Sequence, residues 1–409
     1  MNFSAVRKII LTSIVVGVIF VSGYYFGVNG FKLETASFPK VNISRSIPKN
    51  RSDIDFALFW KVWDTIDSSY YDKSKIDVSK MVYGAISGLT ASLGDPYTSF
   101  LPPEENKMVE EDLSGSFQGV GIQIGFKGKN LAVIAPLPDS PAEKAGVKAG
   151  DLIIGIIDTV KDIEISTNGI NLNDAVKLIR GKAGTKITLV LLRGESTESF
   201  KKEITREAID VPSVTVSYLE SDTVAHIKLI KFGADTDTEW EKVVNEVTNH
   251  NPQIMNIVLD VRNNPGGYLQ GSVDIAGEFV KKDSVVVIED RGGINRTEYK
   301  TDRTGKFGNM KVVILVNGGS ASASEILAGA LSEIKGYKLV GDKTFGKGTI
   351  QEPLQLDKGS SLHITIAKWL TPKGNWIHEK GIEPDVKIAD DDTTLEVDEQ
   401  LIEALKLLK

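Results

Sequence analysis

The sequence contains no cysteine and only four histidines among its 409 residues, and these scarcities exclude several kinds of chemistry. Without thiols the chain forms no disulfide, no thiolate metal site and no cysteine nucleophile, although this does not fix its compartment. The metalloprotease pattern H-E-x-x-H is also missing, and the acidic run 390–392 is typical of a solvated loop. We therefore expect neither a metal site nor a cofactor.

A concentration of positive charge is also missing. The net charge is −7, and acidic and basic residues are mixed along the chain without a basic stripe. Such a stripe is the electrostatic footprint of a nucleic-acid-binding surface, so we expect no nucleic acid partner. There is no internal repeat and no low-complexity segment. A hydrophobic content of 41% over 409 residues is typical of a globular chain with two or three domains.

Only the N-terminus carries a long hydrophobic run. Arg7 and Lys8 precede the uncharged stretch 9–31, which is about as long as a helix that crosses a bilayer. The positive flank stays in the cytoplasm, so the rest of the chain is expected outside it. A cleaved signal peptide is the alternative. We favour an uncleaved anchor because the run is long, Tyr24 and Tyr25 suit a membrane interface, and no A-x-A site follows.

Changes of composition divide the chain into six segments. We expect a membrane anchor or signal segment (1–31), a polar tether (32–52), an N-terminal helical region (53–112), a compact β unit (113–206), a mixed α/β core (207–390) and a C-terminal helix (391–409). The N-terminal helices and the C-terminal helix are the two candidate surfaces for self-association, as a homodimer or a larger oligomer.

These segments are recognised by their hydrophobic periodicity. Apolar residues at three- and four-residue spacing indicate helices that end near the turn 94–96. The first of these stripes is expected to pack in a core: Phe56, Phe59, Trp60, Trp63 and Ile66. Short apolar runs between glycines and prolines predict a mainly antiparallel β unit with one or two helices. Runs such as NIVLDV and KVVILVN lack alternation and lie between helical segments, so the core sheet is expected to be largely parallel and buried on both faces.

Two glycine-rich turns follow strands of this predicted core sheet. NIVLDV runs into RNNPGG (262–267), and KVVILVN runs into GGSASASE (318–325). If the strands are neighbours, the two turns face each other at the carboxyl edge of the sheet, where ligands gather. Gly266 and Gly267 are the free N–H donors of the first turn, because Pro265 has none. Such donors beside a nucleophile make an oxyanion hole, and a plain glycine turn is the alternative.

The serines of the second turn permit two interpretations. Ser322 with Glu325 three positions later is the capping-box pattern of a helix start. The same small residues would let a substrate approach a serine nucleophile, which then needs a base within hydrogen-bond reach. There is no G-x-S-x-G elbow. The four histidines are each more typical of structural or surface positions: His226, His250, His363 and His378.

Lys347 is the better candidate for the base. Glycines flank it in TFGKG, which suits close packing, and an exposed lysine in a glycine turn is the alternative. A lysine acts as a base only when neutral, which requires its pKa to fall by roughly three units from about 10.4. Burial has this effect, because desolvation disfavours the charged form. We expect Lys347 to lie against the serine helix without a close carboxylate, and Gln351 to orient its amine.

Together these motifs resemble the carboxy-terminal processing (tail-specific) serine proteases. GGSASASEI is followed twenty-five residues later by the lysine of TFGKG and, four further on, by a glutamine. SLGDPYTSFLPPEE is similar to the N-terminal region of that family, LDVRNNPGG to its oxyanion segment and LTPKGNWIHEKGIEPDV to its C-terminal region. The β unit resembles its PDZ domain. The resemblance covers nearly all of the chain beyond the tether.

The resemblance implies an α+β multidomain fold: an N-terminal membrane helix, a small helical region, and a PDZ-like β domain inserted before a mixed α/β protease core. It also implies the site residues, which are the nucleophile Ser322, the general base Lys347, its support Gln351, and oxyanion donors from Gly266 or Gly267 and Ala323. This chain departs from the family pattern at Glu333, where an Asp is frequent, and at 158–169, where a short turn is common. A nucleophilic Ser322 would face the cleft, and another group would help to cap its helix.

The implied function is that of a bacterial extracytoplasmic serine endopeptidase that binds the C-terminal tails of protein substrates and cuts through a Ser–Lys dyad and an acyl-enzyme. A PDZ domain binds an apolar tail as an added strand, and its backbone N–H groups bind the terminal carboxylate of that tail. The matching residues here are Gly119, Val120, Gly121 and Ile122. The family implies a gate in which tail binding aligns the catalytic site. The alternatives are an inactive PDZ-type adaptor and an α/β hydrolase or acyl-CoA enzyme.

Overall fold

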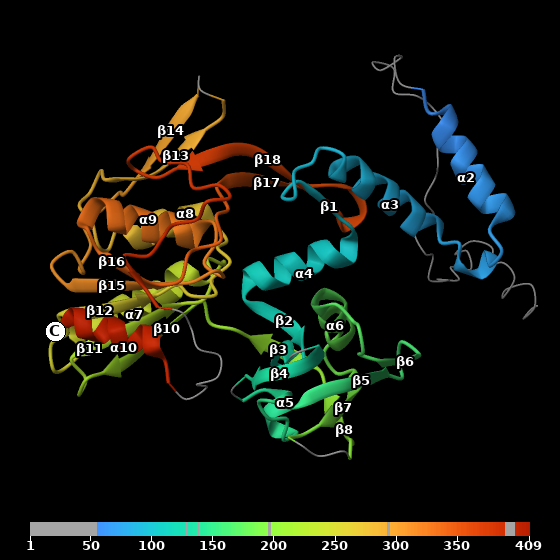
Figure 1. Cartoon of the computed structure of the whole chain (residues 1–409), viewed down its shortest axis with the longest axis horizontal. Helices are drawn as coiled ribbons and strands as arrows, with labels where there is room; N and C mark the ends of the chain where they lie inside the picture. Colours follow the sequence, from blue (N-terminus) through green and yellow to red (C-terminus); the bar gives the residue numbers. More distant parts are fainter. Residues whose placement is uncertain (1–54, 128, 138, 195–197, 293–294, 389–396) are drawn as a thin grey trace, which may run out of the picture. The chain divides into compact units, whose positions relative to one another are not determined.

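A computed structural model describes residues 55–127, 129–137, 139–194, 198–292, 295–388 and 397–409 (Figure 1). It divides the chain into two compact units, one up to Ala85 and one from Ile86 onward. The predicted membrane segment 1–31 and the tether 32–52 lie outside the described residues. Within the described ranges, no helix combines the length and the apolar character needed to span a membrane.

The first unit contains helix α2 (Ala57–Ser69), a 3-10 turn (Lys73–Lys75) and the start of helix α3 (Val78–Ala91). The predicted helices are confirmed, but the prediction that their aromatic stripe packs in a core is wrong. Helix α2 has no buried residue. Its rings contact each other instead, as Phe59 and Trp60 do at 4.9 Å between centroids. The described part of this unit supplies no second layer that could cover the stripe.

The β unit follows helix α4 (Pro103–Ser114) and is antiparallel throughout, as expected. Its strands are β2 (Ser116–Gly119), β3 (Ile122–Lys127), β4 (Asn130–Pro136), β5 (Leu152–Asp158), β6 (Ile163–Ser166), β7 (Lys186–Leu192), β8 (Phe200–Thr205) and β9 (Glu207–Asp210). Two helices accompany them, α5 (Pro141–Lys144) and α6 (Leu172–Ile179). The segment 158–169 forms much of a hairpin in which β6 pairs with β5.

The core contains the predicted mixed sheet, with strand order β10-β11-β12-β15-β16-β19. Only β10 is antiparallel to its neighbour, and the other pairs are parallel. The strands are β10 (Val214–Leu219), β11 (Val224–Leu229), β12 (Asn256–Asp260), β15 (Lys311–Val316), β16 (Lys338–Gly341) and β19 (Val386–Lys387). The helices are α7 (Thr236–Asn249), α8 (Leu269–Ala276), α9 (Ala323–Lys335) and α10 (Glu399–Leu408).

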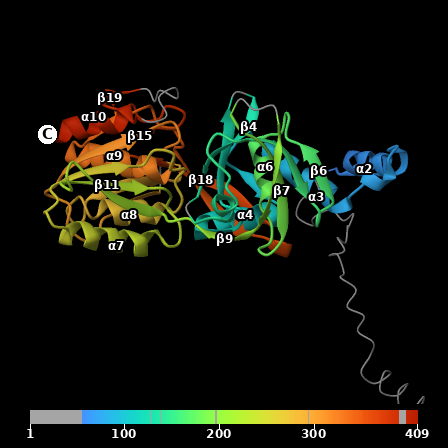
Figure 2. The same ribbon diagram turned by 90° about the horizontal axis from the view of Figure 1, so that it is seen from below.

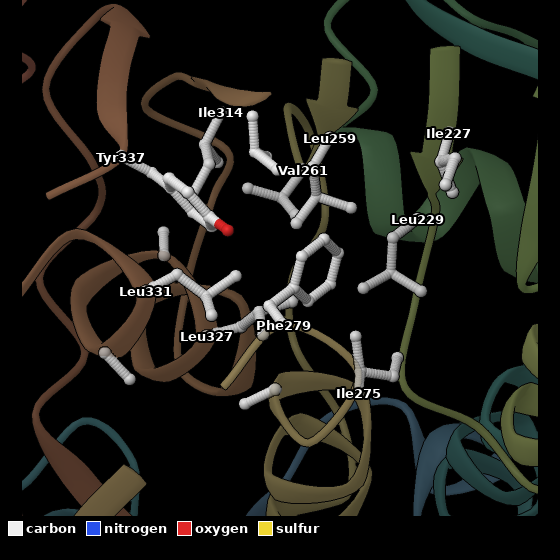
Figure 3. Close-up of a cluster of buried hydrophobic side chains, with 14 of the residues drawn as sticks. Ile227, Leu229, Leu259, Val261, Ile275, Phe279, Ile314, Leu327, Leu331 and Tyr337 are labelled. Carbon is white, nitrogen blue, oxygen red and sulfur yellow. The ribbon is translucent and has the colours of Figure 1, made fainter. Parts of the chain in front are cut away.

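Helices cover both faces of this sheet, which explains why its strands read as continuous apolar runs. Leu259 and Ile314 pack with side chains of α7, α8 and α9, in the cluster that Figure 3 shows. Their neighbours Val258 and Val313 face the other way and pack with Ala404 of α10. In Figure 2, α10 accordingly lies on one side of the sheet, and α7 and α8 on the other. Helix α9 is therefore held in place along most of its length by buried apolar contacts.

A second, antiparallel sheet was not anticipated from the sequence. It has the order β1-β18-β13-β14, and β17 pairs with β18. Its strands are β1 (Ser99–Leu101), β13 (Val285–Asp290), β14 (Arg296–Lys300), β17 (Thr349–Gln355) and β18 (Ser361–Leu370). The pairing of β1 with β18 brings the segment just before the β unit alongside the C-terminal part of the core. Strand β17 of this sheet carries Gln351 and directly follows the loop that contains Lys347.

Candidate active site

The two glycine-rich turns meet at the carboxyl edge of the mixed sheet. Strands β12 and β15 are parallel neighbours, so the turn 262–267 and the turn 317–322 leave the sheet side by side. Two hydroxyl groups fasten the turns together. Ser320 Oγ donates to the Val261 carbonyl at 2.8 Å, and Ser324 Oγ contacts the Asn264 carbonyl at 2.9 Å. Both serines are fully buried, so their hydroxyls are committed to the backbone.

Ser322 differs from these two serines in its exposure, its backbone conformation and the hydrogen bonding of its hydroxyl. It is partly exposed, and it lies at the N-cap of α9 with φ 56° and ψ −116°, a conformation that costs a non-glycine residue free energy. Its N–H donates to Glu325 Oε2 at 2.9 Å, which is one half of a capping box. The Ser322 hydroxyl itself makes no cap hydrogen bond of ordinary geometry. The side chain best placed to act as a nucleophile is therefore that of Ser322.

The NPGG turn packs directly against this serine. A Cβ on Gly266 would lie 2.9 Å from Ser322 Cβ and 3.0 Å from the Ala323 nitrogen, so only glycine fits there. The Gly266 N–H donates to Asn264 Oδ1 at 2.9 Å and is thus engaged within the turn. No hydrogen bond from the Gly267 or Ala323 N–H is present in the described part of the chain. Of the three predicted oxyanion residues, these two have N–H groups available for a ligand.

Lys347 lies on the loop between β16 and β17, and its backbone is held on both sides. Its N–H donates to Glu325 Oε2 at 2.9 Å, and its carbonyl accepts from Trp369 Nε1 at 2.8 Å. A Cβ on Gly348 would lie 2.8 Å from His378 Cβ, which is closer than a side chain tolerates. The expectation that glycines allow close packing here is confirmed, as is the position of Lys347 against the serine helix.

The ammonium group of Lys347 is largely desolvated. Burial lowers its pKa from the usual range, and the carboxylates of Asp95 and Glu325 act in the opposite direction. The prediction that no carboxylate lies close enough to act on Lys347 is therefore wrong. The sequence did not reveal these two because they lie on a loop before β1 and on α9. Lys347 Nζ also lies 5.3 Å from the centre of the Tyr97 ring, a contact that favours the charged form.

Gln351 lies on β17, in the antiparallel sheet. Its amide nitrogen donates to Thr349 Oγ1 at 2.8 Å and to Thr365 Oγ1 at 3.2 Å. These two bonds fix the orientation of the amide. Its service as the partner of the Lys347 amine stays a prediction.

Glu325 is the site residue whose importance sequence reasoning missed. The capping-box pattern accounted for its bond to Ser322, but not for the donors from the loop that carries Lys347. These donors lie about twenty residues further along the chain, so local pattern could not identify them. Glu333, two turns later on α9, instead accepts bonds from Thr371, Lys373 and Asn375, outside the site.

The histidines have structural contacts, as expected. His226 pairs with Asp260 at 3.2 Å. Although burial raises it, the pKa of Asp260 is held well below its usual range by bonds from His226 and Arg262. His378 Nδ1 accepts from the Gly348 N–H at 3.3 Å. Burial, with the nearby charge of Lys347, lowers the pKa of His363.

A separate groove lies in the β unit, between the segment that leads into β3 and helix α6. All four residues predicted to bind a peptide line it: Gly119, Val120, Gly121 and Ile122. The opposite wall includes Leu172 and Val176 of α6. The groove is thus mainly apolar along its sides, with backbone along one edge, as a strand-adding peptide requires.

Comparison with known proteins assigns three parts of the chain to described families. Residues 223–388 match peptidase family S41, residues 133–193 match the PDZ domain, and residues 17–105 match the activating protease CtpB N-terminal domain.

Among the relatives, the carboxy-terminal processing protease CtpB of Bacillus subtilis is 35% identical over 389 residues, which are 94% of this chain and 78% of that protein. The protease CtpA of the same organism is 37% identical over 336 residues, 82% of this chain and 69% of that one. Among solved structures, the photosystem II D1 C-terminal processing protease is 30% identical with a TM-score of 0.53, and the match covers 81% of this chain and 92% of that one.

A putative S41 protease of Bacteroides fragilis shares the fold at 14% identity, with a TM-score of 0.57 over 90% of this chain and 99% of that one. The resemblance first met in the serine and lysine motifs thus extends to three domains and most of the length of these relatives. The chain belongs to the carboxy-terminal processing proteases of peptidase family S41.

Proposed function

We propose that this serine-type peptidase cuts protein substrates near their C-termini through a Ser322–Lys347 dyad and an acyl-enzyme. One observation carries the proposal: a strained, partly exposed serine and a desolvated lysine lie on two segments that bond to the same buried carboxylate. The other two serines of the motif are buried and bonded to carbonyl oxygens, so they are not available for attack.

In the proposed reaction, the neutral Lys347 amine takes the proton of the Ser322 hydroxyl as its oxygen attacks the carbonyl carbon. The developing oxyanion accepts hydrogen bonds from the N–H groups of Gly267 and Ala323. The ammonium then protonates the leaving amine, and a water molecule that Lys347 deprotonates hydrolyses the ester. No hydrogen bond joins Ser322 Oγ to Lys347 Nζ within the described residues, so the proposal requires the lysine side chain to turn toward the serine when substrate binds.

We further propose that the PDZ groove captures the apolar C-terminal tail of a substrate and that the catalytic part works outside the cytoplasm. Arg7, Lys8 and the uncharged run 9–31 support an anchor in the cytoplasmic membrane, or a signal segment whose removal leaves the enzyme in the periplasm. The competing function is an inactive PDZ-type adaptor, which would bind tails without cutting them.

The full chain in detergent is expected to degrade an unfolded protein with an apolar C-terminus, and chelators should not slow it. Ser322→Ala removes the attacking oxygen, so cleavage should fall by at least about a thousandfold. Tail binding by the groove should persist. Ser332→Ala, on the same helix, is the matched control and should keep wild-type cleavage. Tail binding without cleavage by the wild-type protein would instead favour the adaptor.

The groove can be tested separately from the chemistry. Val176→Lys places a charge on the apolar wall of the groove, so the KM for a protein with an apolar tail should rise about tenfold, equivalent to about 1.4 kcal/mol. Val160→Lys, at an exposed position of the same domain, should leave the KM unchanged. Equal KM values for wild type and Val176→Lys would contradict tail capture by this groove.

A further inference from the structure

We propose that Glu325 is a positioning residue of the catalytic site, which fixes the serine turn relative to the lysine loop and sets the charge that Lys347 experiences. This inference rests on the proposed Ser322–Lys347 dyad.

The contacts of Glu325 divide between the two catalytic segments. Its Oε2 accepts from the N–H of Ser322 and from the N–H of Lys347, each at 2.9 Å. Its Oε1 accepts from Thr344 Oγ1 at 2.5 Å and from the Gly346 N–H at 2.7 Å. One oxygen atom therefore joins the backbone nitrogens of the proposed nucleophile and the proposed base. The two segments are therefore coupled through this carboxylate.

Capping alone does not explain such a residue. A helix cap needs the bond to Ser322 only, whereas three of the four donors come from residues 344–347. The side chain is completely buried, and burying a carboxylate is costly unless its oxygens are fully bonded. All four partners are donors, so the position requires a group that accepts at both oxygens, as an ionised carboxylate does. Glutamine would turn an N–H₂ group toward at least one of them.

The charge of Glu325 matters as well as its shape. The groups that act on the Lys347 ammonium are the carboxylates of Asp95 and Glu325, the ring of Tyr97 and the half-buried His363. The two carboxylates stabilise the charged lysine. Glu325 is the one that also holds the lysine backbone, whereas Asp95 bonds to Tyr97 and Thr98. The two acids thus share an electrostatic effect, and Glu325 alone has the positioning effect.

This difference supplies the experiment. In the full chain, Glu325→Gln should lower kcat by about tenfold or more, because misplaced reacting groups lose rate steeply. Its KM should stay within about threefold of the wild type, because substrate capture does not involve this residue. The acidic side of the pH profile of kcat/KM, its acid limb, should move to lower pH, since the loss of a neighbouring negative charge favours the neutral amine. Asp95→Asn should move the limb in the same direction but keep most of kcat.

A purely structural residue would not move the acid limb. If Glu325→Gln keeps the wild-type kcat and acid limb, the proposal is overturned. It is also overturned if the fraction of unfolded protein accounts for the whole loss of rate and the acid limb stays in place. Should Glu325→Gln not fold, Thr344→Val removes a single donor to the same carboxylate and should still lower kcat with KM retained. Wild-type kcat in Thr344→Val would then count against the proposal. Activity in Lys347→Ala, by contrast, would refute the dyad itself.

Discussion

Lys347→Ala is expected to reduce kcat/KM for a protein substrate by at least about a thousandfold, because Ser322 then lacks a group that can take its proton. Lys347→Arg should be equally inactive, since arginine keeps the positive charge but does not lose a proton in proteins. The matched control is Lys343→Ala, an exposed lysine of the same loop that pairs with Glu383. Wild-type rates in Lys347→Ala would exclude a lysine base.

The pH dependence of the wild-type enzyme follows from the same burial. Because desolvation lowers the pKa of Lys347, the neutral amine forms at a lower pH than in a solvated lysine, and kcat/KM should rise with pH until that pKa is passed. A flat profile from about pH 6 to about pH 10 would contradict the assignment.

The burial of Lys347 should also make the stability of the fold depend on pH. Between the lowered pKa in the folded state and the ordinary pKa in the unfolded state, the unfolded chain binds the extra proton, so this lysine destabilises the fold most at low pH. Lys347→Met should therefore raise the Tm at neutral pH, and the gain should shrink as the pH rises above the folded pKa and vanish near the unfolded pKa.

Gly267→Ala is expected to cause the second large loss. Gly267 has φ 136°, a backbone conformation that side chains rarely adopt, and a Cβ there would overlap the Phe232 carbonyl oxygen. The turn must shift, and its N–H then leaves the place where an oxyanion would form. Loss of one oxyanion donor typically costs about a hundredfold to a thousandfold in kcat. Steady-state kinetics and the Tm should be measured together.

A suitable control is Gly308→Ala. Gly308 does not have a positive φ, and the nearest atom to an added Cβ is the Phe279 carbonyl oxygen at 3.6 Å. This variant should keep both kcat and Tm. If Gly267→Ala retained the wild-type kcat, the Gly267 N–H would not be an oxyanion donor, whatever the fate of the dyad.

Much of this site could be predicted because its information is local. Apolar runs without alternation identified β12 and β15, and the glycines after them identified turns that meet once the strands are neighbours. The choice of Ser322 as nucleophile came from resemblance and stays a prediction; the bonds of Ser320 and Ser324 to carbonyl groups are consistent with it.

What the sequence could not indicate depends on contacts between distant segments. The partners of Glu325 and the approach of Asp95 to Lys347 arise only after α9, the lysine loop and the segment before β1 come together. The prediction that the aromatic stripe of α2 packs in a core failed for a related reason. Periodicity shows that a face is apolar, but it does not show whether another layer of the same chain covers that face.

The pairing of β1 with β18 has a consequence for how the enzyme is made. Because β1 precedes the PDZ domain and β18 lies near the end of the core, the protease is interrupted in sequence and the PDZ domain is synthesised between its two parts. The early part, which carries Asp95 and Tyr97, cannot pair until β18 has left the ribosome. Closing that long connection costs chain entropy, which a PDZ domain already folded on its own would reduce. A chain whose β18 has not yet been synthesised therefore cannot complete this antiparallel sheet, so the segment that carries Asp95 and Tyr97 stays unpaired until late in synthesis.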